Sequence, residues 1–233
     1  MRAYPFAIAS MLAVAGISHS PLRGHEGPGD DGGDRGDSSG TGSIQGTFAS
    51  FERVKTRGAT SERDVVVYLV SDSRTEHAPP ATPPVVSQEK LEFSPHVLPV
   101  LAGSTVVFRN LDGVTHNVFS AEDCCSMDID MESGGPETTR KFTEPCVVSA
   151  VCRLHPDMSL WIVVLDNPWF THVELEKVEQ GDDKVYTSAF EIAGVPPGTY
   201  TLTFWNKALK PQEYEVTVEP GKATSFDVTI AKQ

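Results

Sequence analysis

Short runs of apolar residues, separated by polar turns, extend along most of the chain. In the stretch TYTLTFW, residues Tyr200, Leu202 and Phe204 place a large apolar side chain at every second position, which is typical of a strand with one buried face. Similar runs (GSIQGTF, DVVVYLV, CVVSAVC and LWIVVL) are bounded by Gly, Pro, Asn and Asp, and no long segment has a helical period. The pattern predicts an all-β protein built from sandwiches of short strands.

The first 42 residues lie outside this pattern. Residues 1–20 begin with a positive charge and a mostly apolar stretch that is too short to span a bilayer, which predicts a secretory signal peptide, with an uncleaved anchor as the alternative. Residues 21–42 are rich in Gly and Asp and predict a disordered linker. We therefore expect a periplasmic or secreted protein, in an oxidising compartment where cysteines can form disulfides.

The 233 residues carry a formal net charge of −13. This charge argues against a nucleic-acid surface, on which Lys and Arg must neutralise phosphates. It is compatible with a cationic protein partner, although acidity can also serve solubility alone.

Candidate chemistry comes from the stretch VCRLHPDMSLWIVV (151–164), in which Cys152, His155 and Met158 lie three positions apart. His116 lies upstream, just before another apolar strand. Two imidazoles, a thiolate and a thioether are the ligand set of a blue-copper electron-transfer site. Each residue alone would be an ordinary core residue, but the four together indicate a copper site.

Residues 85–168 resemble a known family. The stretch LEFSPHVLPVLAGSTVVFRN followed by HNVF is similar to the plastocyanin and amicyanin group of cupredoxins, and the spacing Cys-x2-His-x2-Met resembles the amicyanin form. The resemblance implies a Greek-key cupredoxin sandwich with one type 1 copper site. It implies His116, Cys152 and His155 as equatorial copper ligands, Met158 as the weak axial ligand, and Asn117 as the residue that ties the two ligand loops together by hydrogen bonds.

The same resemblance implies an exported one-electron carrier between redox partners, such as a cytochrome or a dehydrogenase. His155 would be the exposed electron port, surrounded by Leu91, Val114 and Pro156. Thr115 stands where plastocyanins commonly have Pro, so their partner surface is not carried over. The whole chain also resembles exported plastocyanin-like proteins described as methylamine-utilisation proteins.

Other chemistries fit the motif less well. A dinuclear purple centre needs a second bridging Cys three residues from the first, which this sequence lacks. Copper oxidases and nitrite reductases place a His beside the Cys, whereas Val151 and Arg153 flank Cys152. Zinc would take a closed set of nitrogen and thiolate ligands, and Met is a poor zinc ligand. We therefore expect no enzymatic activity. A copper-sequestering or sensing protein and an extracellular adhesin-like module remain the alternatives.

The remaining cysteines are expected to have a structural role. Cys146 lies six residues before Cys152, ~20 Å along an extended strand at ~3.3 Å per residue, and is too far away to be a ligand of the same metal. We expect a disulfide at the far end of the sandwich that joins Cys146 to Cys124 or Cys125 and leaves one thiol. A second Cu(I) site in CCSMDIDM is the alternative. It would use Cys124, Cys125, Met127 or Met131. The other histidines, at positions His25, His77, His96 and His172, show no ligand spacing, and we expect them to face solvent.

The flanks of the copper region resemble the transthyretin-like regulatory modules of carboxypeptidases, in which a strand like GSIQGTF precedes one like VVVYLV. This resemblance implies a second, discontinuous β-sandwich from residues 43–72 and 170–232, with the cupredoxin inserted into it. In the alternative, serial arrangement, the early strands belong to the copper sandwich.

Overall fold

The computed structural model describes residues 40–50, 56–57, 60–61, 63–72, 75–180 and 183–230. In these ranges the chain forms strands and turns without a helix, so the all-β prediction is confirmed. Consequently, the described part of the chain has no helix that could cross a membrane. The predicted signal peptide, His25 and nearly all of the predicted linker lie outside the described residues.

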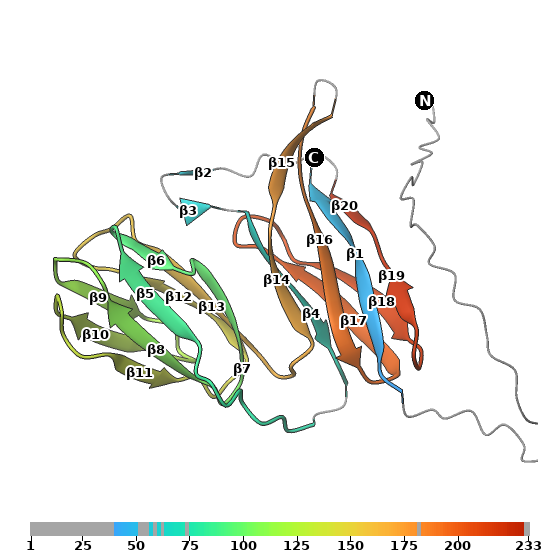
Figure 1. The fold of residues 1–233 in the computed structure, drawn as a ribbon, viewed down its shortest axis with the longest axis horizontal. Helices are drawn as coiled ribbons and strands as arrows, with labels where there is room; N and C mark the ends of the chain where they lie inside the picture. Colours follow the sequence, from blue (N-terminus) through green and yellow to red (C-terminus); the bar gives the residue numbers. More distant parts are fainter. Residues whose placement is uncertain are drawn as a thin grey trace, which may run out of the picture. The chain divides into compact units, whose positions relative to one another are not determined.

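Two facing sheets make up a first sandwich, from residues 85–165 (Figure 1). Its five-stranded sheet has the order β10 (Met127–Met131), β9 (His116–Ser120), β12 (Cys146–Val151), β13 (Ser159–Leu165) and β7 (Val97–Leu101). Its four-stranded sheet has the order β11 (Thr138–Lys141), β8 (Thr105–Asn110), β5 (Val85–Glu89) and β6 (Glu92–Ser94).

The core of the first sandwich follows from alternation along the strands. In β8, Val106 and Phe108 are fully buried, whereas the alternating residues Thr105, Val107 and Arg109 are only partly buried. Strand β5 pairs with β8 in parallel, and β7 pairs with β13 in parallel. Strands that are not consecutive in sequence therefore lie side by side in each sheet. Burying one such side chain contributes about 1.5–3 kcal/mol. The same apolar cluster contains Cys152 and Met158.

The other two main sheets take strands from both sides of residues 85–165 (Figure 1). We call them the second sandwich. One sheet has the order β15 (Glu176–Gln180), β16 (Asp183–Val195), β1 (Gly42–Ser50) and β19 (Ala223–Ser225), with β20 (Val228–Ile230) also on β1. The other has the order β14 (Phe170–Glu174), β4 (Asp64–Val70), β17 (Gly198–Trp205) and β18 (Gln212–Val218), and β2 (Thr56–Arg57) pairs only with β3 (Thr60–Ser61).

Early and late strands share this second core because β1 and β4 each pair with late strands on both edges. Strand β1 runs antiparallel to β16 and parallel to β19 and β20, while β4 runs antiparallel to β14 and β17. Gly46 is required where β1 lies against the main chain of Phe226, because a Cβ there would lie 1.9 Å from the Phe226 carbonyl oxygen. The second sandwich therefore cannot be assembled until residues on both sides of the first have been made.

A small third apolar cluster includes residues of both sandwiches. Val97 and Val163 of the first sandwich pack with Val66 and Trp205 of the second. The Trp205 ring lies 5.9 Å from that of Trp161 between centroids, which extends the apolar contact.

Candidate metal centre

Strand pairing brings the predicted ligands together. His116 is the first residue of β9, and Cys152 follows the last residue of β12; Val151 of β12 pairs with Phe119 of the neighbouring β9. Within the segment from Cys152 to Met158, hydrogen bonds close a tight loop: His155 N–H donates to Cys152 O (3.2 Å), and Met158 N–H donates to His155 O (3.0 Å). Cys152 N–H donates in turn to Met158 O (3.1 Å).

Three side-chain atoms converge at this end of the first sandwich. The Nδ1 atoms of His116 and His155 lie 3.0 Å apart, and the Cys152 Sγ lies 3.9 Å from the first and 3.6 Å from the second. A triangle with these sides has a centre about 2.1 Å from every corner, against ~2.0–2.1 Å and ~2.3 Å for bonds from His nitrogen and Cys sulfur to a first-row metal such as zinc. The triangle is acute, so this centre lies between the three atoms. These three side chains could therefore hold one metal ion between them.

Burial distinguishes the members of this site. His116 is fully buried and Cys152 is 1% exposed, whereas His155 is only partly buried. Met158 is fully buried in the same apolar cluster as Cys152 and belongs to the same loop. Its role as the axial ligand stays a prediction. Polar groups enclosed in this way need a partner, which a bound metal would supply.

Asp112 is a functional residue that the sequence analysis missed. Its Oδ2 lies 2.8 Å from the Nε2 of His116, and a carboxylate accepts hydrogen bonds. Nε2 therefore carries the proton, which leaves the lone pair of Nδ1 free for a metal. An acidic residue four positions before a ligand His, in the turn that leads to its strand, was the signal available.

The electrostatics of Asp112 suit this role. Its burial alone would raise the pKa of the carboxyl group, but hydrogen bonds from the Leu91 main chain, the His116 ring and the Lys90 main chain outweigh that effect. The net pKa lies below its ordinary value. Asp112 thus remains a carboxylate beside the buried imidazole.

Asn117 bonds to the Cys loop through its main chain and to β10 through its side chain. Its main-chain N–H donates to Cys152 Sγ over 3.3 Å, which ties the His strand to the thiolate. Its side-chain Nδ2 instead donates to the carboxylates of Asp128 (2.8 Å) and Asp130 (3.0 Å) on β10. The side-chain link therefore runs from β9 to β10.

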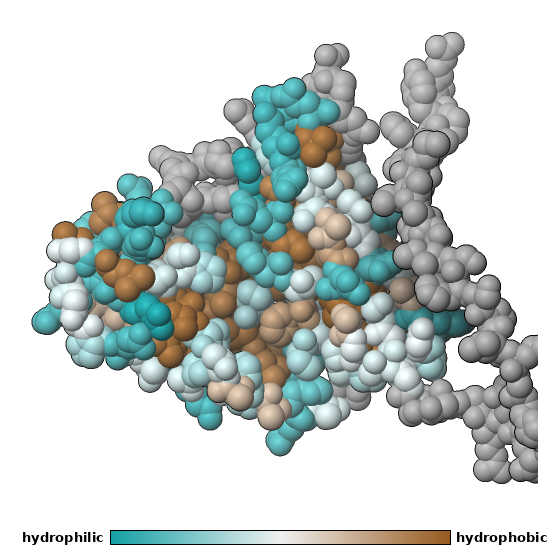
Figure 2. All heavy atoms as spheres, viewed as in Figure 1, coloured by the Kyte–Doolittle hydropathy of each residue, from teal (hydrophilic) through white to brown (hydrophobic). Residues whose placement is uncertain are grey.

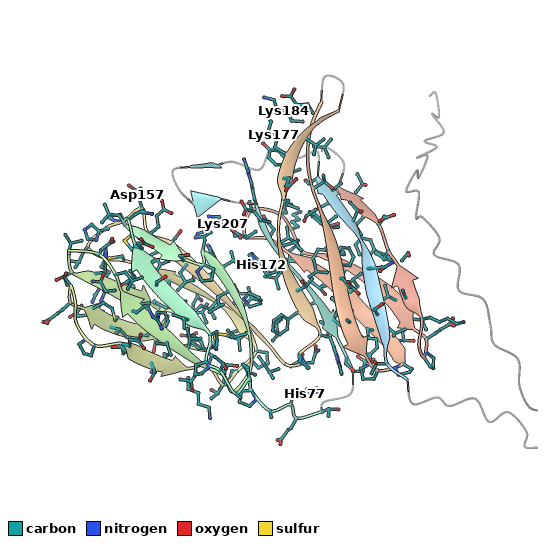
Figure 3. The ribbon with its side chains drawn as sticks, in the orientation of Figure 1. His77, Asp157, His172, Lys177, Lys184 and Lys207 are labelled. Atoms are coloured by element: carbon teal, nitrogen blue, oxygen red, sulfur yellow. A yellow bond between two sulfur atoms is a disulfide. The ribbon has the colours of Figure 1, made fainter. Side chains whose placement is uncertain are left out.

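Arg153 braces the outer side of the ligand loop. Its guanidinium forms an ion pair with Asp128 and lies 4.7 Å from the ring centroid of Phe119. Hydrogen bonding from Asn117, helped by the Arg153 charge, lowers the pKa of Asp128 despite some desolvation. Four residues after Arg153, Asp157 lies at the loop end of the first sandwich, opposite the end near His77 (Figure 3).

The expected disulfide is present and joins Cys124 to Cys146. Cys146 begins β12, whereas Cys152 follows its last residue, so the two cysteines lie at opposite ends of that strand. Cys125 is a buried free thiol in the core of the first sandwich. The alternative Cu(I) site in this segment would lose Cys124, whose sulfur is already bonded.

The prediction that the remaining histidines face solvent is confirmed for the exposed His172 and is wrong for His77 and His96, which are partly buried. His96 is partly buried, and its Nδ1 lies 2.8 Å from Ser159 O. His172 pairs with Asp64 over 2.8 Å, and the ring of His77 packs edge-on against Trp169. Their partners are distant in sequence, so the local sequence could not show them.

Residues 83–231 match the copper binding proteins of the plastocyanin/azurin family, which is more than half of the chain. The chain belongs to this family. Membership identifies copper as the metal for the cluster of His116, Cys152 and His155, which is the one group of at least three His, Cys, Asp or Glu side chains within metal-binding reach among the described residues. The predicted copper cofactor is therefore confirmed.

Several solved cupredoxin structures are similar to part of the chain. Amicyanin from Paracoccus versutus is 22% identical, with a TM-score of 0.34, and the match covers 42% of this chain and 97% of amicyanin. A purple cupredoxin from Nitrosopumilus maritimus is 21% identical, with a TM-score of 0.31, and the match covers 35% of this chain and 99% of that protein. No curated protein matches the chain.

Proposed function

We propose that the protein is a one-electron carrier with a type 1 copper site. The convergence of two Nδ1 atoms and one thiolate around a single point, with one of the imidazoles reaching the surface, carries this proposal. Bound copper would supply the one-electron redox chemistry. His116, Cys152 and His155 would hold it, with Met158 as the axial ligand.

The surroundings of the ligands favour electron transfer over simple storage. His116 is held by Asp112, Cys152 by the N–H of Asn117, and the loop by its own main-chain hydrogen bonds. These contacts limit how far the ligands can move when their metal gains or loses an electron. A storage site would not need such a restrained geometry.

The surface around His155 supports a role as the electron port. Among the described residues, six large hydrophobic side chains are exposed, and four of them lie on the three loops at this end of the first sandwich. Apolar spheres are visible among hydrophilic ones on this part of the molecule (Figure 2). These four residues, which we call the apolar rim, are Leu91, Leu111, Val114 and Leu154.

We further propose that the partner is a cationic redox protein, such as a cytochrome or a dehydrogenase, and that the chain itself catalyses no reaction. The net charge of −13 would steer a basic partner toward the molecule, and the apolar rim would make the close contact. The apolar N-terminal stretch supports export to the periplasm or beyond.

The second sandwich, in this proposal, is a transthyretin-like scaffold. Its resemblance to regulatory modules, and the resemblance of the whole chain to the exported methylamine-utilisation group, support a structural role beside the copper site. Its apolar core is separate from that of the first sandwich, so it can serve as a rigid support.

The proposal is tested by loading the purified protein with Cu(II). We expect one copper per chain, an intense visible absorption from the Cys152 thiolate, and rapid exchange of electrons with a basic cytochrome. Leu154→Ser should slow this exchange without changing the absorption, while Val178→Ser, at an exposed site on the second sandwich, should change neither. A protein that binds copper tightly but stays colourless would indicate sequestration instead.

A further inference from the structure

The exposed turn between β5 and β6 is connected to a copper ligand through one carboxylate. Lys90 and Leu91 form this turn, and both have left-handed backbone angles, with φ of 58° and 62°. Their main-chain N–H groups donate to the two oxygens of Asp112, at 2.6 Å for Lys90 and 2.9 Å for Leu91. Non-glycine residues seldom adopt this conformation, so the turn depends on such a partner.

Asp112 is itself held firmly from the other side. Its N–H donates to Asn110 Oδ1 (2.9 Å), and its carbonyl accepts a hydrogen bond from Ser133 Oγ (2.9 Å). The Nδ2 of Asn110 donates in turn to Val114 O and Met131 O, at 2.8 and 2.9 Å. Met131 pairs with His116, so the carboxylate is fixed relative to the strand that carries the ligand.

One Asp112 oxygen, Oδ2, serves both ends of the connection. It accepts from the Leu91 N–H at 2.9 Å and from the His116 Nε2–H at 2.8 Å. Because these donors share the same negative charge, a weaker bond to the turn leaves a stronger acceptor for the imidazole. A carboxylate that accepts from a ligand His raises the basicity of its metal-binding nitrogen.

The two ends of this connection differ in exposure. Leu91 is 50% exposed and belongs to the apolar rim, whereas His116 is fully buried and cannot be touched from outside. The Lys90 side chain is 85% exposed. A protein that docks beside His155 through the rim therefore meets the turn as well.

We infer that Asp112 is a positioning residue that orients His116 and connects the Lys90–Leu91 turn of the docking surface to the copper site. The inference builds on the proposed electron-carrier function and adds a route by which partner contact alters the site. Docking on the turn changes the hydrogen bonds that Asp112 accepts. The bond to His116 changes with them, and so does the balance between the two copper oxidation states.

The first test replaces Asp112 with Asn, which keeps the shape and removes the charge. We expect the blue absorption to remain, copper affinity to fall about 10-fold, and the midpoint potential to rise. Glu89→Gln is the matched control, because it removes a carboxylate beside the Lys90–Leu91 turn that pairs with the exposed Lys90 side chain rather than with His116. An equal effect of the two variants would reduce Asp112 to a distant charge and overturn the inference.

The second test addresses the connection to the turn. Leu91→Pro removes the N–H donor and cannot adopt a φ of 62°, whereas Leu91→Gly keeps the donor and accepts that angle. We expect Leu91→Pro to shift the midpoint potential, Leu91→Gly to leave it unchanged, and the Leu91→Pro shift to disappear when Asp112→Asn is also present. If Leu91→Pro shifted the midpoint potential equally with and without Asp112→Asn, or shifted it in neither case, the turn would not be connected to the copper site through Asp112.

A readout without copper separates this inference from the proposed function. In the metal-free protein, proton NMR should show a downfield, slowly exchanging His116 Nε2–H signal, which moves upfield in Asp112→Asn but not in Glu89→Gln. If Asp112→Asn fails to fold, Asp112→Glu, which displaces the carboxylate by one methylene, should move the same signal. A colourless copper-loaded wild type would refute the carrier function, whereas an unmoved signal would refute the role of Asp112.

Discussion

The two sandwiches use the same kind of apolar core but treat buried polar groups in opposite ways. In the second sandwich, the side chain of buried Asn206 is satisfied by main-chain groups: its Nδ2 donates to Asp64 O, and its Oδ1 accepts from Ala208 N–H. In the first, the buried His116 and Cys152 direct their lone pairs at one shared point. A buried polar residue therefore indicates a metal site only when its free lone pairs point at the same position as those of its neighbours.

The surfaces of the two sandwiches differ in the same way. The second sandwich has two scattered exposed hydrophobic residues among those described, Val70 and Val178. The apolar rim of the first sandwich gathers four around the partly buried ligand His155. Scattered apolar residues are normal on a soluble protein, whereas a group beside a ligand indicates contact with a partner.

The largest effect should come from replacing, one at a time, the two cysteines at opposite ends of β12 by Ser. Cys152→Ser should abolish the intense visible absorption, because only a thiolate provides the strong charge-transfer bond. Cys146→Ser should keep the colour and lower the free energy of unfolding by about 3 kcal/mol, since a 22-residue separation is no longer cross-linked. Absorption spectra and denaturant unfolding measure both. Loss of colour in Cys146→Ser alone would reverse the assignment.

Mutations that create a cavity in one core or the other should show which of the two cores supports copper binding. Leu160 and Leu202 are both fully buried, one in each core, and their replacement by Ala should cost about 3 kcal/mol of stability. Leu160→Ala should also weaken copper binding, because Leu160 pairs with Ala150 close to the ligand loop. Leu202→Ala should leave copper affinity unchanged, as measured by competitive titration. Equal losses of affinity would mean that the two cores act as one.

A smaller change is expected from the thioether. Met158→Leu should retain copper and the blue colour while raising the midpoint potential, since a weak donor to Cu(II) is lost. Stability should change by less than about 1.5 kcal/mol, because the substitution conserves volume in a buried position. Voltammetry and spectroscopy provide the measurement. A variant that no longer binds copper would show that the axial role of Met158 is wrong.

The smallest effect concerns the contact between the sandwiches at His96. Desolvation lowers the pKa of His96, the Ser159 hydrogen bond opposes this, and the Lys207 charge adds to it; Asp64 and Glu92 act weakly in the opposite direction. The Lys207 Nζ lies 3.2 Å from His96 Nε2, so the neutral ring fits best (Figure 3 labels Lys207).

Because the folded-state pKa lies below the unfolded value of about 6.5, the unfolded chain binds the extra proton first. This contribution to stability is complete above pH ~6.5 and is lost as the pH falls from there toward the folded pKa. Metal-free His96→Gln should therefore lose less stability than the metal-free wild type between pH 7.5 and 5.5. Thermal unfolding at both pH values measures this, and parallel losses would exclude His96 as the cause.

The sequence alone was sufficient for several features of the copper site. The spacing of Cys152, His155 and Met158 on one short loop, and the position of His116 before an apolar strand, are local patterns. So is the alternation that buries Val106 and Phe108, because a strand repeats every two residues. The copper cofactor and the β-fold could be predicted for this reason.

Only the tertiary structure decided the rest, because it depends on contacts between residues that are distant in sequence. The pairing of Cys146 with Cys124 rather than Cys125 depends on such a contact, and so do the partners of His96 and His172. The side chain of Asn117 turned to β10, although its sequence position suggested the Cys loop. The spacing of four residues could indicate the contact between Asp112 and His116, but only folding placed the β5–β6 turn against the same carboxylate.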